Sequence, residues 1–124
     1  MTTKRIVITA GEPAGIGPDL TLALSQESWP HQLVVCADKT LLAERAKLLG
    51  IEVEFLDYDA TAAKEPQRSG TLVVKHVPLS ESTIAGQLNE ANGHYVLNTL
   101  ETAAIGCMND EFDAIVTGPV HKGV

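Results

Sequence analysis

The residues best suited to do chemistry lie in the stretch 11–19, which reads Gly-Glu-Pro-Ala-Gly-Ile-Gly-Pro-Asp. Three glycines and two prolines in nine residues are typical of a sharp turn that brings the backbone close to another group. Pro18 and Asp19 favour a helix start, because proline at the first helical position loses no needed donor and an acid complements the helix dipole. We therefore expect a glycine-rich loop and a helix N-terminus whose free N–H groups could meet an anion or a cofactor.

Two known phosphate-binding patterns fit this stretch poorly. The Rossmann pattern G-x-G-x-x-G, started at Gly15 and Gly17, places Leu20 where the third glycine belongs, and the Walker spacing is absent. Asp38 stands where an acid would hold a ribose in a Rossmann domain, but it also suits a helix N-cap. The residues alone leave open a ligand-facing loop, a tight structural turn and a non-catalytic Rossmann-type nucleotide- or phosphate-binding module.

The elements that must position this loop alternate between apolar strands and amphipathic helices. Apolar or alternating runs predict strands at 5–9, 32–37, 51–56, 71–77 and 112–117. Periodic apolar residues and cap signals predict three helices: from Leu20 to about 26–28, from the Asp38 N-cap to Gly50, and from Asn89 to Gly106. The third of these helices has an apolar stripe of Val96, Leu100 and Ala103. The third strand, with acids on one side, is expected at an edge, and 57–70 and 80–86 are expected to be loops. This order predicts an α/β fold with a largely parallel sheet flanked by helices.

Composition indicates one globular domain that works in the cytoplasm. The chain has 124 residues, 44% of them hydrophobic and 20% charged. A net charge of −7 without any basic cluster argues against nucleic acid and anionic membranes as partners. The apolar runs are far shorter than the roughly 20 residues of a membrane span, and no signal peptide is recognisable. The two cysteines, Cys36 and Cys107, form no Cys-x-x-Cys pair, which indicates reduced thiols.

The stretch Gly11–Asp19 also resembles the opening signature of the 4-hydroxythreonine-4-phosphate dehydrogenase (PdxA) family. Other stretches resemble that family in the same order along the chain: 33–38, 85–87 with 92–96, and 117–123. Members of the family continue beyond this end-point, so the resemblance implies that residues 1–124 are a truncated amino-terminal α/β portion. Truncation accounts for a last strand and a Gly118-Pro119 turn with no helix after them. A sheet cut in this way is expected to expose apolar surface and to self-associate.

The resemblance implies a fold and an activity. The fold is like that of isopropylmalate and isocitrate dehydrogenases, in which two α/β domains flank a cleft, and the full-length form is a homodimer. The activity is NAD(P)-dependent oxidation, with decarboxylation, of 4-phosphooxy-L-threonine, a small phosphorylated amino acid, in pyridoxine 5'-phosphate (vitamin B6) biosynthesis. Gly15, Ile16 and Gly17 then become residues on the side of NAD or NADP, where glycines admit the ligand and Ile16 offers apolar surface. Lys122 could hold the substrate phosphate as a point charge, and His121 could donate to it or shuttle a proton.

The family also implies a divalent metal (Zn, Mg or Co), bound by histidines in motifs that this chain does not contain. The chain's own histidines lack the spacing of a metal site on one element, and His94 is expected to be a helix-surface or packing residue. No metal ligand and no catalytic residue is therefore assigned here, and the 124 residues alone are expected to be inactive. Glu12 and Asp19 could be an acid–base pair, but capping and dipole effects explain both acids more simply.

Overall fold

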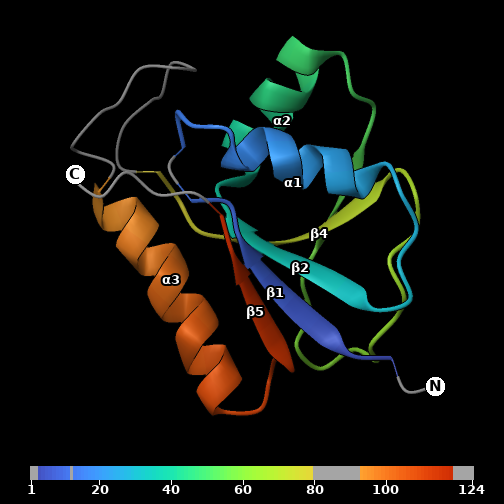
Figure 1. Cartoon of the computed structure of the whole chain (residues 1–124), viewed down its shortest axis with the longest axis vertical. Coiled ribbons are helices and arrows are strands. Elements are labelled where there is room, and N and C mark those ends of the chain that lie inside the picture. Colours follow the sequence, from blue (N-terminus) through green and yellow to red (C-terminus); the bar gives the residue numbers. More distant parts are fainter. Residues whose placement is uncertain (1–2, 12, 80–92, 119–124) are drawn as a thin grey trace.

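The computed structural model describes residues 3–11, 13–79 and 93–118, which form a parallel sheet with helices on both faces (Figure 1). The strands are β1 Arg5–Thr9, β2 Gln32–Ala37, β3 Glu54–Asp57, β4 Thr71–His76 and β5 Ala114–Thr117. The helices are α1 Gly17–Ser25, α2 Lys39–Leu49 and α3 Gly93–Met108. The strand order is β3-β4-β2-β1-β5, and every neighbouring pair is parallel. The predicted α/β fold with a largely parallel sheet is confirmed.

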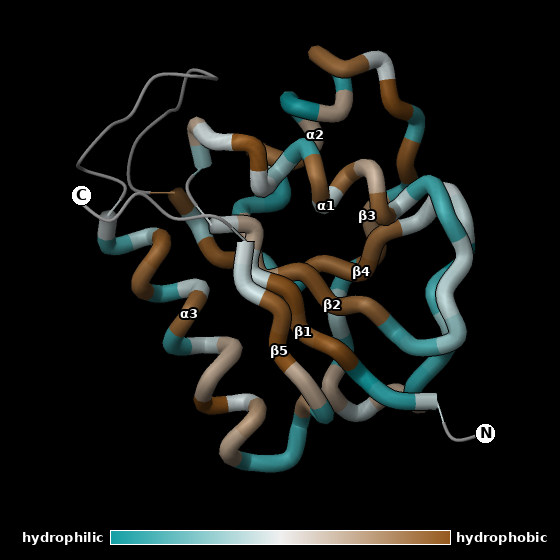
Figure 2. Tube along the Cα trace, viewed as in Figure 1, coloured by the Kyte–Doolittle hydropathy of each residue, from teal (hydrophilic) through white to brown (hydrophobic). Residues whose placement is uncertain are grey.

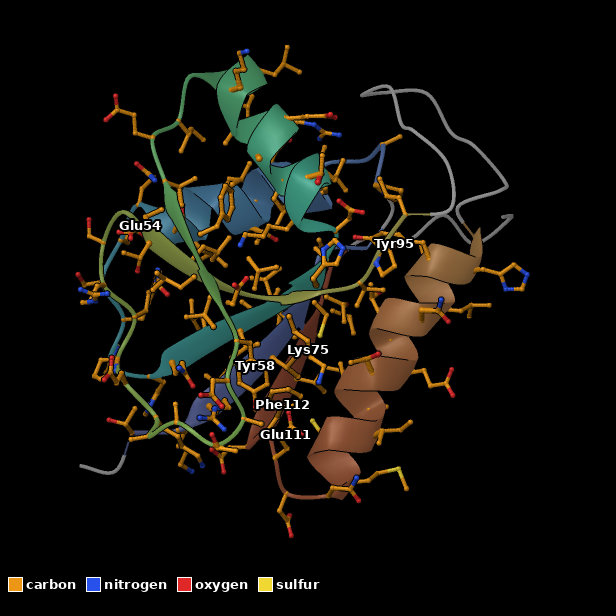
Figure 3. All side chains as sticks on the ribbon, turned by 180° about the vertical axis from the view of Figure 1, so that it is seen from behind. Glu54, Tyr58, Lys75, Tyr95, Glu111 and Phe112 are labelled. Atoms are coloured by element: carbon orange, nitrogen blue, oxygen red, sulfur yellow. The ribbon has the colours of Figure 1, made fainter. Side chains whose placement is uncertain are left out.

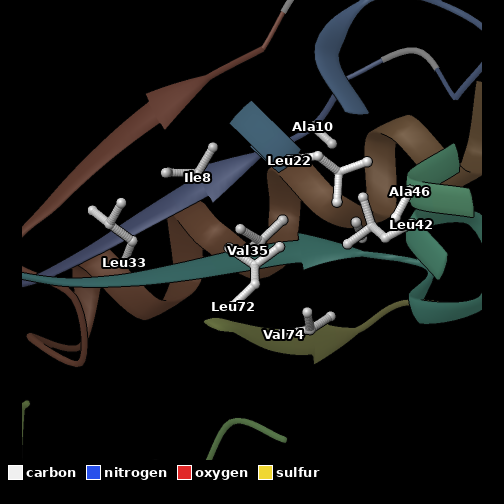
Figure 4. Packing of buried hydrophobic residues seen from close by; sticks show 10 residues of the cluster. Ile8, Ala10, Leu22, Leu33, Val35, Leu42, Ala46, Leu72 and Val74 are labelled. Carbon is white, nitrogen blue, oxygen red and sulfur yellow. The ribbon is translucent and has the colours of Figure 1, made fainter. Parts of the chain in front are cut away.

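The central strands are apolar on both sides because helices cover both faces of the sheet. On one face, α1 and α2 enclose a cluster that includes Leu22, Val35 and Leu42 (Figure 4). On the other face, α3 packs over a second cluster that contains Val34 and Tyr95. Apolar residues consequently line the strands in the middle of the molecule, and hydrophilic ones gather on the outer loops (Figure 2).

The third strand begins later than predicted, because Gly50 and Ile51 form the C-terminal cap of α2. Gly50 ends α2 in the left-handed conformation at φ +70°, and the N–H of Ile51 donates to the carbonyl of Ala46 at 2.9 Å. β3 therefore starts at Glu54 rather than at Ile51. It occupies one edge of the sheet, as expected, and its Phe55 packs on the α1–α2 side.

The buried face of α3 differs from the predicted stripe. Its buried residues are Tyr95, Thr99, Ala103 and Gly106, while the predicted Val96 and Leu100 are only partly buried. Two specific contacts set this face. Tyr95 bonds to the backbone of Asp38, and a Cβ on Gly106 would lie 2.3 Å from the ring of Phe112. His94 is exposed, which fits the helix-surface placement rather than the packing one, and the predicted first turn at 89–92 lies outside the described residues.

The other edge strand, β5, exposes apolar side chains. Ile115 and Val116 are 40% and 53% exposed, so the apolar surface expected at the end of the sheet is present. Of the loop predicted at 57–70, Asp57 is the last residue of β3 and residues 58–70 form an irregular connection, whereas the loop predicted at 80–86 lies outside the described residues. Within the part of the chain that the structure describes, no helix is long and apolar enough to cross a membrane.

Candidate functional site

The loop after β1 turns and packs as its glycines predict. Gly11 has φ +77°, a conformation that side-chain-bearing residues rarely adopt. Gly17 is the first residue of α1, and a Cβ there would lie 1.6 Å from the carbonyl oxygen of Ala10. Because α1 begins at Gly17, Pro18 is its second residue and not, as predicted, its first. Only glycine lets α1 begin this close to the end of β1.

The three predicted cofactor-side residues differ in their surroundings. Gly17 is buried, Gly15 is half-buried, and the Ile16 side chain is 60% exposed. Leu20 is 52% exposed, and its N–H donates to the carbonyl of Ile16 at 2.9 Å. Because residues four apart share a helix face, Ile16 and Leu20 together present apolar surface at the tip of the loop. Ile16 is therefore the member of the set that is open to a ligand.

Arg45 reaches from α2 to the loop and is buried there, with 5% of its surface exposed. Its Nη2 donates to the carbonyl of Pro13 at 2.8 Å, and its Nη1 donates to the carbonyl of Gly15 at 3.0 Å. The same Nη1 lies 2.6 Å from Oδ1 of Asp19, in the first turn of α1. Asp19 thus has an ion-pair partner besides the helix dipole. One guanidinium joins α2, the loop and α1.

Reasoning from the sequence missed Arg45, because only the apolar residues of α2 were used to define its buried face. A signal was nevertheless present. Arg45 follows Leu42 by three residues and Leu41 by four, which places it on the same side of the helix as two buried leucines. A charged residue in an apolar stripe needs a buried partner, and here the partner is the loop.

The end of β5 lies directly beside the end of β1. Thr117 stands opposite Thr9 in the strand register, and the N–H of Gly118 donates to the carbonyl of Thr9 at 2.7 Å. A Cβ on Gly118 would lie 2.6 Å from that oxygen. The first and last of the family-like stretches therefore meet at the carboxyl edge of the sheet. The predicted substrate residues His121 and Lys122, and also Glu12, lie outside the described residues.

Asp38 occupies the same edge, between β2 and α2. Its side chain accepts from the N–H of Leu41 at 3.0 Å and from that of Leu79 at 2.8 Å, and the residue is 8% exposed. Its own N–H donates to the hydroxyl of Tyr95, near the start of α3, at 2.9 Å (Figure 3). The predicted N-cap is confirmed. With both carboxylate oxygens bonded to backbone donors, Asp38 is poorly placed to hold a ribose.

A second polar cluster lies at the opposite, amino-terminal end of β1 (Figure 3). The buried Arg5 donates to Gln32 at 2.6 Å and to the hydroxyl of Tyr58 at 3.2 Å. That hydroxyl in turn donates to Glu111 at 2.8 Å. Burial, followed by the hydrogen bond to Glu111, raises the pKa of Tyr58 to about 12. The cluster ties the connection after β3 to the sheet, away from the glycine-rich loop.

The described residues do not by themselves form the divalent-metal site that the resemblance implies. Across 3–11, 13–79 and 93–118, no three side chains of His, Cys, Asp or Glu come together as metal ligands would. His31 accepts from the N–H of Lys4 at 3.1 Å, and His76 accepts from the N–H of Lys39 at 3.0 Å. These two histidines hold the backbone through Nδ1.

The fold and this edge define a class, the parallel α/β domain with a glycine-rich loop at a topological switch point. β1 connects through α1 to β2 on one side, whereas β5, on its other side, is reached through α3 on the opposite face. Sheets of this class bind ligands in the crevice at such a point. The family model described as pyridoxal phosphate biosynthetic protein PdxA matches residues 28–124. The chain belongs to the PdxA family.

Individual relatives agree with this family. The chain is 71% identical over 127 residues to a 4-hydroxythreonine-4-phosphate dehydrogenase of Vibrio parahaemolyticus, covering 100% of the chain and 38% of that protein. It is 70% identical over 124 residues to the protein of the same name in Vibrio cholerae, with the same coverage. These curated relatives are thus much longer than the chain, which spans 38% of their length.

Solved structures confirm the fold class. The crystal structure of 4-hydroxythreonine-4-phosphate dehydrogenase from Klebsiella pneumoniae matches with a TM-score of 0.85 and 26% identity, over 97% of this chain and 38% of that one. A putative 4-hydroxythreonine-4-phosphate dehydrogenase from Salmonella typhimurium matches with a TM-score of 0.81 and 30% identity, over 97% and 39%. Such dehydrogenases have a fold like that of isocitrate dehydrogenase, as the sequence resemblance implied.

Proposed function

We propose that these residues are the amino-terminal α/β portion of an NAD(P)-dependent 4-hydroxythreonine-4-phosphate dehydrogenase. The full-length enzyme oxidises 4-phosphooxy-L-threonine, with decarboxylation, in pyridoxine 5'-phosphate biosynthesis. The observation that carries this proposal is the contact between Gly118 and Thr9, at 2.7 Å. It brings the family-like stretch 117–123 against the end of β1, from which the family-like stretch 11–19 follows, at the ligand-binding edge of the sheet. Identity of 70% or more to relatives of that name supports it.

In this enzyme, the loop at Gly15, Ile16 and Gly17 lies on the cofactor side. The nicotinamide of NAD or NADP supplies the chemistry by accepting a hydride, and the loop helps to position it. Ile16 provides the apolar contact, since its side chain is largely exposed. Gly17 keeps the start of α1 against β1, and Gly15 lets the backbone approach the ligand.

His121 and Lys122 are the proposed substrate residues. They follow shortly after Gly118, so the backbone that leads to them starts from the carboxyl edge of the sheet. Lys122 binds the phosphate as a point charge, and His121 donates a hydrogen bond to it or moves a proton. The divalent metal, Zn, Mg or Co, takes its ligands from parts of the enzyme outside these residues. The enzyme works as a cytoplasmic homodimer, and the 124-residue chain alone is inactive.

The alternative is a non-catalytic Rossmann-type binding module. It requires Asp38 to be free for a ribose, whereas the Asp38 side chain caps α2 and accepts from Leu79. The dehydrogenase therefore accounts for this edge better than the binding module does.

The test is turnover of 4-phosphooxy-L-threonine by the full-length protein, followed as formation of NADH or NADPH. We expect activity that is lost on chelation and restored by a divalent ion, and no activity from the 124-residue chain. Lys122→Met should raise the KM for the phosphorylated substrate, and the exposed Lys47→Met should not. A full-length protein that forms no reduced cofactor from this substrate would overturn the proposal.

A further inference from the structure

We propose that Arg45 is a positioning residue for the cofactor-side loop, an inference that rests on the proposed function of that loop. Arg45 binds the inward-facing carbonyls of Pro13 and Gly15, and this arrangement presents Ile16 outward at a fixed place. Arg45 itself is too deeply buried to be counted among the groups that touch the cofactor. Its effect is transmitted through the loop.

The loop is held at two points, and Arg45 is the second of them. The first point is Gly17, whose close packing on Ala10 fixes the start of α1. Between this point and the end of β1, Pro13 and Gly15 both give their carbonyl oxygens to one guanidinium. Without Arg45, the buried carbonyl of Pro13 would lose a charge-assisted hydrogen bond. Because an unsatisfied buried carbonyl is unfavourable, the loop would then shift to expose this carbonyl to water.

The guanidinium is suited to this task because it is planar and carries several donors in a fixed geometry. It satisfies two carbonyls and the Asp19 carboxylate together, at distances of 2.8, 3.0 and 2.6 Å. A lysine could keep the ion pair with Asp19, but a single ammonium does not reproduce the fork. An arginine buried to this extent is also tolerated only when its charge is paired, and Asp19 supplies that pairing.

Helix α2, which carries Arg45, is itself held firmly in the fold. α2 begins at the Asp38 cap, and its Leu42 and Ala46 pack in the cluster beneath α1. Arg45 lies between these two residues in the sequence, so its backbone is held by the same packing. A rigid base lets a side chain fix the place of a loop to the precision that cofactor orientation needs.

The experiment compares three variants of the full-length protein: Arg45→Met, Arg45→Lys and the matched control Arg68→Met, which removes an exposed arginine. Each is measured for melting temperature, for dinucleotide affinity by calorimetry, and for the KM of each substrate. We expect Arg45→Met to raise the dissociation constant and KM of the dinucleotide by about tenfold or more, since small misplacements are costly. The KM of the phosphorylated amino acid should change much less. Arg45→Lys should fall between Arg45→Met and wild type, and Arg68→Met should match wild type.

The outcomes separate this inference from the proposed function. If Arg45→Met lowers the melting temperature but leaves dinucleotide affinity and KM unchanged, Arg45 is merely structural and the inference is wrong. If Arg45→Met does not fold, Arg45→Lys decides, and unchanged dinucleotide affinity there overturns the inference. If the wild-type protein binds dinucleotide without oxidising 4-phosphooxy-L-threonine, the proposed function fails. In that case the dinucleotide affinities of the Arg45 variants still test the role of Arg45: weaker binding by Arg45→Met supports it, and unchanged binding overturns it.

Discussion

The backbone N–H of Gly118 donates to the carbonyl oxygen of Thr9 at 2.7 Å, so the ends of β5 and β1 are in direct contact. The two residues come from opposite ends of the chain. Gly118 belongs to the family-like stretch 117–123, and Thr9 lies two residues before the family-like stretch 11–19. Their contact brings the glycine-rich loop and the segment that leads to His121 and Lys122 to one edge of the sheet.

Gly118→Ala should destabilise the full-length protein and lower its activity. The new Cβ would lie 2.6 Å from the Thr9 carbonyl oxygen, which belongs to a central strand and cannot move aside freely. We expect a loss of about 1–3 kcal/mol in the free energy of unfolding, measured with urea. The control is Gly70→Ala, at φ +84° with no atom within 4 Å, which tests backbone strain without a clash and should leave activity intact. Wild-type stability in Gly118→Ala would contradict the close packing.

Asp38→Ala should cost stability without weakening dinucleotide binding. Two backbone N–H groups, those of Leu41 and Leu79, would lose their acceptor. We expect a loss of about 1–2 kcal/mol by urea unfolding. Asp57→Ala is the control, since the Asp57 side chain is mostly exposed and its ion pair with Lys39 should contribute little. Loss of dinucleotide affinity at wild-type stability would instead favour the Rossmann-type binding module.

Thr9→Val should stabilise the protein. The Thr9 hydroxyl is fully buried and has no hydrogen-bond partner among the described residues, so replacing it by a methyl group of similar shape removes an unsatisfied polar atom. We expect a gain of about 1 kcal/mol in the free energy of unfolding. Thr99→Val is the matched control, because that buried hydroxyl donates to the carbonyl of Val96 at 2.7 Å and its removal brings no such gain. If Thr9→Val is clearly destabilising, the hydroxyl has a partner in solution.

Tyr58 should ionise only in strongly alkaline solution. Its pKa is raised to about 12 by burial and by the hydrogen bond to Glu111. Because the folded-state pKa exceeds the unfolded value, near 10, the stabilisation is complete below about pH 10 and is lost as the pH rises toward 12. The measurement is the difference in tyrosinate absorbance between the wild type and Tyr58→Phe. Glu111→Gln should move this titration to lower pH, and an unshifted titration would show that Glu111 is not a partner.

Local features were predictable because neighbours in the sequence determine them. The cap at Asp38 and the left-handed Gly50 were predicted correctly, since both depend on backbone donors and acceptors within one turn. The alternation of strands and helices, which predicts the parallel sheet, also follows from short-range patterns. The start of β3 was misjudged by three residues, from Ile51 to Glu54, because the helix cap competes with the strand for the same backbone groups.

Features that depend on distant partners were not predictable in this way. The buried face of α3 is set by contacts of Tyr95 with Asp38 and of Gly106 with Phe112. The hydropathy pattern of the helix predicts neither contact. The sequence by itself determined the element order, the caps and the family, because these depend on local chemistry and on motifs. Only the tertiary structure decided that Arg45 would bind the glycine-rich loop and that Gly118 would meet Thr9. Both contacts require segments distant in the chain to pack at one edge, and that packing is a property of the folded sheet.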